Sequence, residues 1–380
     1  MAAPASKRRT GFVYDTLAVR GWSTGDPNGI YPADPAAQIF PGRHFENHDT
    51  KLEMWHLLDA TRITRELARI EARRATRQEL LRAHTATHID KVNATSALER
   101  GGLIGGPDTP IGHNGHIIAE LAFGGAIDLA KAVWKGDVSN GYMLMRPPGH
   151  HATRNAAMGF CTYNNLAGAA KALLAGGTKR ILVLDYDVHH GNGTYDIFKD
   201  DARVVIVDMH QSECFPPESG RTEERGAHKN VLNLDLPPGT GHETALYAMD
   251  KVVIPAIKRH DPEIILVSSG FDSGITDPLG RFMFGPMTYR EITKRLMRAA
   301  DNRTCKGRIV MFHEGGYEQN FVPECGLAVL EELTGIDTGR DFVADAVTTW
   351  QNKGNKPEVL ALHRKMVDEV AAFVPEIPAH

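Results

Sequence analysis

Short apolar runs alternate with longer helical patterns along most of this chain. The runs lie at residues 141–145, 180–184, 204–207, 264–267 and 308–312, and the helical patterns at 165–175, 243–260 and 288–302. This alternation is typical of an open parallel sheet covered by helices on both faces. We therefore predict an α/β fold in a single domain over residues 1–380. The motif-bearing core is expected at roughly residues 80–335, with mostly helical additions at both ends.

Four of the runs lead directly into loops rich in polar residues or glycine. These loops are Arg146–His151 (RPPGHH), Asp185–Gly193 (DYDVHHGNG), Ser268–Asp272 (SSGFD) and His313–Tyr317 (HEGGY). In open parallel sheets the ligand site lies beyond the carboxyl ends of the strands. We therefore expect the four loops to converge on one site.

The best candidates for metal ligands are Asp187, His189 and Asp272. Asp185, Asp187 and His189 are spaced two residues apart, which puts them on one side of an extended chain. Two carboxylates and one imidazole suit zinc with an open coordination position, as in a catalytic site. Such residues can also merely cap turns at strand ends, but that interpretation weakens when several strand ends carry them together.

Two histidine pairs are alternative metal ligands, because His48 stands four positions after His44 and His88 four positions after His84. Neither pair has the glutamate of a His-Glu-x-x-His motif. We expect these histidines to lie on the surface or to form local hydrogen bonds. The cysteines include no Cys-x-x-Cys pair, so we expect neither a disulfide framework nor a thiolate zinc site.

The composition limits the partners. A net charge of −4 gives no sign of the basic surface that nucleic-acid binding needs. No segment approaches the roughly 20 apolar residues of a membrane helix, and no signal peptide is recognisable. We therefore expect a cytoplasmic enzyme that binds neither nucleic acid directly nor membranes.

Several linked motifs resemble those of the histone deacetylase family, and most of all the bacterial class II amidohydrolases. They are Pro147–Ala152 (PPGHHA), Gly159–Cys161 (GFC), Asp185–Thr194, Ser269–Asp272 (SGFD) and Glu314–Tyr317 (EGGY), in this order. The resemblance implies the arginase/deacetylase α/β fold and zinc-assisted removal of an acyl group from an amine. The substrate would be an acylated lysine peptide or a small acylated amine, and relatives suggest a homo-oligomer, either a dimer or a tetramer.

Carried over by position, Asp187, His189 and Asp272 would hold one Zn²⁺ per chain, and Tyr317 would donate a hydrogen bond to the oxyanion. Zinc lowers the pKa of a bound water to about 7 and polarises the carbonyl. A phenol aimed at the tetrahedral oxygen stabilises the developing charge. A packed aromatic after a tight Gly-Gly turn is the alternative role for Tyr317.

The resemblance also assigns the histidine pair. His151 would be the general base toward the water and would later protonate the leaving amine, with His150 as its partner in holding charge. Asp185 and Asn192 stand where the family orients these two imidazoles, and Asn192 is the class II form. A histidine with a pKa near neutrality can take and return a proton.

The family's substrate tunnel and potassium sites can be matched in the same way. The substrate positions are Phe160 and Phe215 as aromatic walls, Gly159, Leu279 at the rim, Asp108 in a nearby loop, and Gly315 and Gly316. Core packing is the alternative for the two phenylalanines, and an ordinary turn for Asp108. One structural K⁺ would be held by Asp185 with the carbonyls of Asp187, His189 and Met209, and a second by the carbonyls of Phe198, Asp201 and Val204.

Two positions depart from the family pattern. Asp208 stands where the family usually has serine beside the first K⁺, where the extra charge could tighten the cation or displace its usual ligands. Glu53 falls where the family has an arginine beneath the active site.

Three other functions compete with this interpretation. A binuclear Mn²⁺ hydrolase like arginase would need carboxylates at Gly191 and Gly274, which cannot ligate. A non-catalytic acyl-lysine binding module would be expected to lose Tyr317 or one of the histidines. Hydrolysis of small amides, such as acetylpolyamines or xenobiotic amides, stays open beside acyl-lysine hydrolysis, because only Asp108, Glu213 and Glu218 are candidates for an acidic rim.

Overall fold

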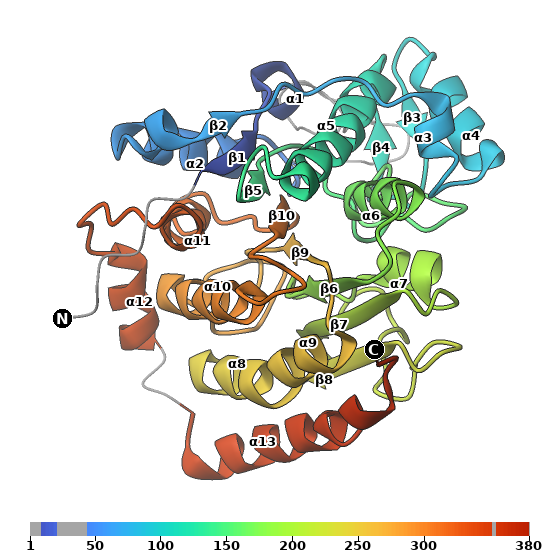
Figure 1. The fold of residues 1–380 in the computed structure, drawn as a ribbon. Helices are drawn as coiled ribbons and strands as arrows, with labels where there is room; N and C mark the ends of the chain where they lie inside the picture. Colours follow the sequence, from blue (N-terminus) through green and yellow to red (C-terminus); the bar gives the residue numbers. More distant parts are fainter. Residues whose placement is uncertain (1–8, 21–43, 352–354, 380) are drawn as a thin grey trace, which may run out of the picture.

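The structure is a computed structural model that describes residues 9–20, 44–351 and 355–379. Its centre is an eight-stranded sheet in the order β2-β1-β5-β10-β9-β6-β7-β8, in which every neighbouring pair is parallel (Figure 1). The strands are β1 (Thr10–Val13), β2 (Ala68–Arg69), β5 (Asn140–Met143), β6 (Ile181–Asp185), β7 (Val204–Gln211), β8 (Val231–Leu236), β9 (Ile264–Ser269) and β10 (Ile309–His313). A separate antiparallel pair joins β3 (Gly102–Leu103) to β4 (Pro110–Ile111).

Helices cover both faces of the sheet, as predicted (Figure 1). One face packs against α2 (Asp49–Ala60), α8 (His242–Ala248), α9 (Ile254–His260), α10 (Pro286–Ala300), α11 (Val322–Thr334) and α13 (Pro357–Ala371). The other face packs against α3 (Arg77–Leu80), α4 (Ala86–Ser96), α5 (Gly115–Lys135), α6 (Asn165–Ala175) and α7 (Asn192–Phe198). The other helices are α1 (Thr16–Arg20), α12 (Val343–Gln351) and two short 3₁₀ helices, Ile63–Glu66 and Val374–Glu376. A π-helical turn, Met249–Val253, lies between α8 and α9.

The apolar runs form strands because both of their faces are buried. In β6, Leu182 and Leu184 belong to one core while Ile181 and Val183 belong to the other. The same division by alternate residues holds in β7, β9 and β10. Successive side chains of a strand point to opposite faces, so a strand between two helix layers must be apolar throughout. This explains why these segments appear in the sequence as continuous apolar runs.

The prediction was incomplete at the edges of the sheet. The N-terminal region, expected to be mostly helical, contributes the strands β1 and β2, and β8 was not predicted. The predicted strand at 204–207 extends to Gln211. The helix predicted at 165–175 has the expected bounds, and the one predicted at 243–260 is interrupted by the π-helical turn.

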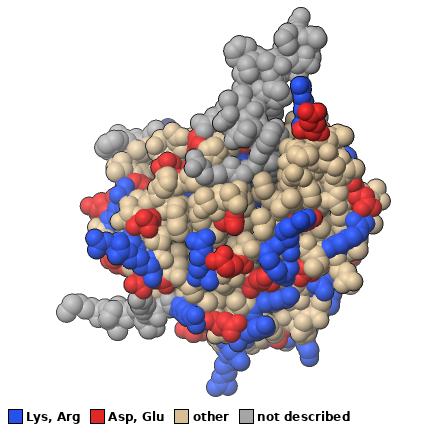
Figure 2. All heavy atoms as spheres, turned by 90° about the horizontal axis from the view of Figure 1, so that it is seen from above, with Lys and Arg blue, Asp and Glu red and all other residues tan. Residues whose placement is uncertain are grey.

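Figure 2 shows Lys and Arg side chains interspersed with Asp and Glu over the face seen from above, without a broad area of one sign. Among the described residues, no helix combines the length and apolar character needed to cross a bilayer.

Candidate active site

The four predicted loops do converge, because β5, β10, β9 and β6 are consecutive neighbours in the parallel sheet. Their carboxyl ends therefore open on the same edge, where ligand sites of such sheets lie. The loop after β6 carries Asp187 and His189, the loop after β9 carries Asp272, and the loop after β10 carries Tyr317. The loop that follows β5 carries His150 and His151.

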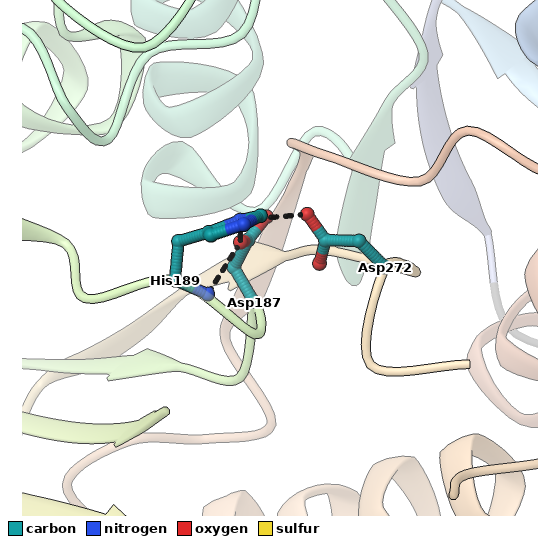
Figure 3. A group of neighbouring side chains, drawn as sticks. All are labelled: Asp187, His189 and Asp272. Atoms are coloured by element: carbon teal, nitrogen blue, oxygen red, sulfur yellow. Dashed lines mark hydrogen bonds and ion pairs between the residues drawn. The ribbon is translucent and has the colours of Figure 1, made fainter. Parts of the chain in front are cut away.

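Asp187, His189 and Asp272 form a compact group of ligand atoms, all within 4.8 Å of one another (Figure 3). The Nδ1 atom of His189 lies 3.1 Å from Asp187 Oδ1 and 3.1 Å from Asp272 Oδ2. Both carboxylates are fully buried. Two buried carboxylates with a single imidazole carry uncompensated negative charge, which a divalent cation would neutralise. The donor set therefore fits one zinc ion, and it is the one group of three such ligands among the described residues.

The backbone closes tightly around these carboxylates. Asp187 Oδ2 accepts a hydrogen bond from the N–H of Gly315, and Asp272 Oδ1 accepts one from the N–H of Val188. A Cβ atom at Gly315 would lie 2.0 Å from Asp272 Oδ2, and one at Gly270 would lie 2.2 Å from Asp187 Oδ2. Glycine is required at both positions because the backbone approaches the ligands so closely.

The positions that would carry a second metal ion supply no ligand. A Cβ at Gly191 would lie 2.6 Å from Asp185 Oδ2, and one at Gly274 would meet the ring of Phe321 at 3.0 Å. This supports one metal ion per chain.

His150 lies beside the metal ligands and is positioned by Asp185. Its Nδ1 is 3.1 Å from Asp185 Oδ2, and its Nε2 is 3.8 Å from Asp187 Oδ1. Burial by itself would lower the pKa of His150, but the negative charges of Asp187 and Asp185 outweigh it and raise the pKa to about 10. His150 is therefore suited to carry a positive charge.

His151 has the opposite electrostatic environment. Burial and the neighbouring His150 and His189 lower the pKa of His151 well below its usual value. Its Nδ1 lies 2.8 Å from Asn192 Oδ1, and since an amide oxygen only accepts hydrogen bonds, Nδ1 must carry the proton. The Nε2 atom is then free to accept a proton. The two adjacent histidines thus suit the two different roles that the resemblance implies.

A cavity of about 240 Å³ leads to these groups. Phe160 and Phe215 line it together with His151, His189 and Tyr317, and its other lining residues are Asp108, Gly159, Cys214 and Leu279. Phe215 meets the ring of His151 edge-on at 5.0 Å between centroids, and Phe160 meets Tyr317 edge-on at 5.9 Å. The phenylalanines therefore line the approach to the candidate zinc site rather than packing in the core.

Tyr317 is held by a residue that the sequence did not single out. Asp277 Oδ2 accepts the backbone N–H of Tyr317, and Asp277 Oδ1 accepts that of Leu279. Burial and the charges of Asp272, Asp187 and Asp277 raise the pKa of Tyr317 well above its usual value. The phenol therefore stays protonated and can donate a hydrogen bond.

Glu314 belongs to one of the predicted motifs, but the sequence assigned it no role. Its Oε2 accepts the backbone N–H groups of Gly149 and His150, so it holds the histidine loop in place. The adjacent glycines were predicted to contact substrate. Neither is among the residues lining the cavity, since Gly315 packs against the metal-site carboxylates and Gly316 against Phe271.

The expectation for Glu53 was wrong. Its side chain is 55% exposed on α2, and Lys51 instead supplies the buried cation. Lys51 Nζ lies 3.1 Å from Glu46 Oε1 and 5.9 Å from the centroid of the Tyr317 ring, while Arg146 forms a bidentate pair with the same carboxylate. Burial by itself would raise the pKa of Glu46, but Arg146 and Lys51 lower it to about 2.

Asp208 is balanced by a partner of its own. Its Oδ1 lies 2.7 Å from His210 Nδ1, and its Oδ2 accepts the N–H of Gly191. Burial opposes charge on His210, but Asp208 outweighs it and raises the pKa of His210. The extra negative charge beside the first potassium position therefore faces a histidine whose protonated form it favours. Met209 follows Asp208 in the chain. In the register between β6 and β7, Asp208 stands opposite Asp185.

At the second potassium position, the carbonyl oxygens of Phe198, Asp201 and Val204 do converge. They lie 2.9, 3.4 and 2.9 Å from the side-chain nitrogen of Asn230, whose two N–H groups point among them. A potassium ion there would have to share these oxygens with that amide.

The histidine pairs weighed as alternative ligands form hydrogen bonds with the backbone. His84 and His88 contact Thr153 O and Thr162 O, and His44 contacts Glu46 O. His48 is partly exposed beside Asp49. None of the four belongs to a group of three metal-ligating side chains in the described part of the chain.

Comparisons with known proteins agree with this geometry. The histone deacetylase domain model matches residues 44–333. A histone deacetylase-like amidohydrolase of Pseudomonas aeruginosa is 40% identical over 351 residues, covering 88% of this chain and 90% of the relative. A probable deacetylase of Archaeoglobus fulgidus is 36% identical over 272 residues, covering 70% of this chain and 74% of that protein.

Among solved structures, the crystal structure of the HDA15 HD domain superposes with a TM-score of 0.79 at 30% identity. The match covers 97% of this chain and 98% of that one. The matched sequence, the shared fold and the buried Asp-His-Asp group lead to one conclusion: the chain belongs to the histone deacetylase family.

Proposed function

We propose that this protein is a zinc-dependent amide hydrolase that removes acetyl or other acyl groups from lysine side chains or related amines. One observation carries the proposal. A single cavity is lined by the metal-site residue His189, the neutral His151 and the protonated Tyr317, behind the walls of Phe160 and Phe215. Its aromatic walls suit an extended alkyl chain such as the lysine methylenes.

The residues divide the chemistry among them. Zinc held by Asp187, His189 and Asp272 would polarise the scissile carbonyl and lower the pKa of a water molecule. His151 Nε2 accepts a proton from the attacking water as the new C–O bond forms. Tyr317 donates a hydrogen bond to the developing oxyanion. His151 then returns its proton to the nitrogen as the C–N bond breaks, leaving a free amine and a carboxylic acid.

The proposal is tested with zinc-loaded protein and three substrate classes: acetyl-lysine peptides, acetylated polyamines and simple anilides. We expect hydrolysis of at least one class and its inhibition by a hydroxamate. Turnover limited to polyamines or anilides would assign the small-amide function and reject the lysine substrate. No turnover of any class by protein with one zinc per chain would contradict the proposal.

Tyr317→Phe should lower kcat by about 10²–10³, the usual effect of removing one oxyanion donor. KM should change little, because the ring that meets Phe160 is retained. Steady-state kinetics on the best substrate of the panel measures both constants. An unchanged kcat would assign Tyr317 to packing alone.

Asn192→Asp should shift the acid limb of the kcat/KM profile to higher pH. A carboxylate at 2.8 Å from Nδ1 favours the imidazolium form and so raises the pKa of His151. Because only the neutral imidazole accepts a proton, a raised pKa removes the active form over a wider acidic range. An acid limb unchanged from that of the wild type would show that His151 does not control it.

A further inference from the structure

Two buried histidines outside the metal site, His84 and His88, bind the segment that forms one wall of the cavity. His84 Nδ1 lies 2.8 Å from Thr153 O, and its Nε2 accepts the backbone N–H of Asn164 at 3.0 Å. Both ends of the 153–164 segment are therefore joined to one imidazole. His88, four residues further on in the first turn of α4, has its Nε2 2.9 Å from Thr162 O.

Both imidazoles are only 1% exposed. Since His84 Nε2 accepts a hydrogen bond, the proton of the neutral ring lies on Nδ1, where it is donated to Thr153. Burial lowers the pKa of His84 to about 3, which keeps this neutral tautomer near neutral pH. His88 donates from Nε2, and its buried Nδ1 meets no hydrogen-bond partner among the described residues. Each ring is thus fixed in one tautomer with a defined contact.

The segment that these histidines bind has a backbone that needs support. Phe160 has a φ of +68°, a left-handed conformation that side-chain-bearing residues rarely adopt and that persists only where the surroundings hold it. Other contacts also hold the segment: Phe160 N–H donates to Thr109 Oγ1, Met158 and Cys161 form a reciprocal backbone pair, and the backbone of Arg154 is bound by Asp196 Oδ2 and Thr85 N–H. At positions 153, 162 and 164 the backbone is bound by histidine side chains. His84 binds residues 153 and 164, and His88 binds residue 162.

The same segment determines the geometry of the reactive groups. The Phe160 ring forms the wall beside Tyr317. Gly159 packs so tightly on His151 that a Cβ there would lie 2.3 Å from His151 Cδ2. A shift of this segment would therefore move the wall and disturb the contact with His151 together.

We propose that His84 and His88 are positioning residues that hold the Phe160 segment in the conformation that grips substrate. They act on the cavity through the backbone of residues 153–164 and touch neither metal ligand nor substrate. The kinetic part of this proposal rests on the proposed function, whereas its structural part does not.

The test uses isosteric replacements. A glutamine nitrogen can take the place of histidine Nε2, whereas asparagine is too short to reach it. His88→Gln can therefore keep the donor to Thr162 O, and His88→Asn loses it. We expect His88→Asn to raise KM about tenfold, as one lost buried hydrogen bond allows, with a smaller fall in kcat from the disturbed contact between Gly159 and His151. His88→Gln should stay within about twofold of the wild-type KM.

His84 forms two hydrogen bonds, to Thr153 O and from the N–H of Asn164. His84→Gln and His84→Asn each keep one of these two bonds, so each should raise KM. The exposed His228 provides the control His228→Asn.

Hydrogen exchange measured by mass spectrometry gives a readout that needs no activity. Peptides covering 154–163 should exchange about tenfold faster in His88→Asn than in His88→Gln, at equal zinc content. If His88→Asn does not fold, the two His84 variants carry the same measurement. Exchange equal to wild type in the folded variants would overturn the proposal even if the enzyme is active. If no substrate of the panel is hydrolysed, the proposed function fails while this measurement still decides the positioning role.

Discussion

Asp272→Asn should bind much less than one zinc per chain and should hydrolyse amides at least about 10³-fold more slowly, since a catalytic metal contributes several kilocalories per mole to the reaction. The fully buried Asp272 carboxylate is one of two negative charges facing His189 Nδ1. Asparagine keeps the side-chain volume and an oxygen for the N–H of Val188, but it removes the charge. Zinc is measured by atomic absorption after dialysis, and the rate with the best substrate of the panel.

Asp301→Asn, the same substitution at an exposed position, is the matched control and should behave as wild type. Circular dichroism should show that both variants keep their helices and strands. A full equivalent of zinc and normal hydrolysis in Asp272→Asn would place the metal elsewhere. Two zinc ions per wild-type chain would revive the binuclear alternative that Gly191 and Gly274 disfavour.

The sequence predicted the grouping of Asp187, His189 and Asp272 because two independent regularities coincide there. Strands buried on both faces appear as continuous apolar runs, so their ends could be located along the chain. Parallel pairing then requires those ends to share an edge, which brings Asp272 to Asp187 and His189 from a distant part of the sequence. Strands that are very short or that include polar residues lack this signal. β2 has only two residues, and β8 includes the polar Asn233 and Asp235.

Residues that act through the backbone were not predictable in the same way. Asp277 and Glu314 position Tyr317 and the histidine loop through backbone N–H groups, and no side-chain spacing marks such contacts. Glu53 was misplaced because the registry of α2 decides which of its residues faces inward, and the helix turns Lys51 rather than Glu53 toward Glu46. The histidines at 84 and 88 had helical spacing, but only the fold reveals that backbone carbonyls are their partners.

His151→Ala should retain zinc but lower kcat by about 10²–10⁴, the usual contribution of a positioned acid–base group. His151 is not among the metal ligands, and its Nε2 is the atom left free when Nδ1 is bound to Asn192. His150 cannot replace it, because Asp185 and Asp187 favour its protonated form. The loss should therefore appear in kcat, with the zinc content unchanged.

The pH profile distinguishes loss of the base from general damage to the site. If His151 is the base, the acid limb of kcat/KM should disappear in His151→Ala, because the group whose protonation stops the reaction has been removed. His228→Ala, at an exposed histidine, should keep both the rate and the limb. His150→Ala should also be slower, since it removes a charge that stabilises the transition state, but it should keep the acid limb set by His151. A His151→Ala protein with a rate within tenfold of wild type, or with its acid limb intact, would assign proton transfer to another group.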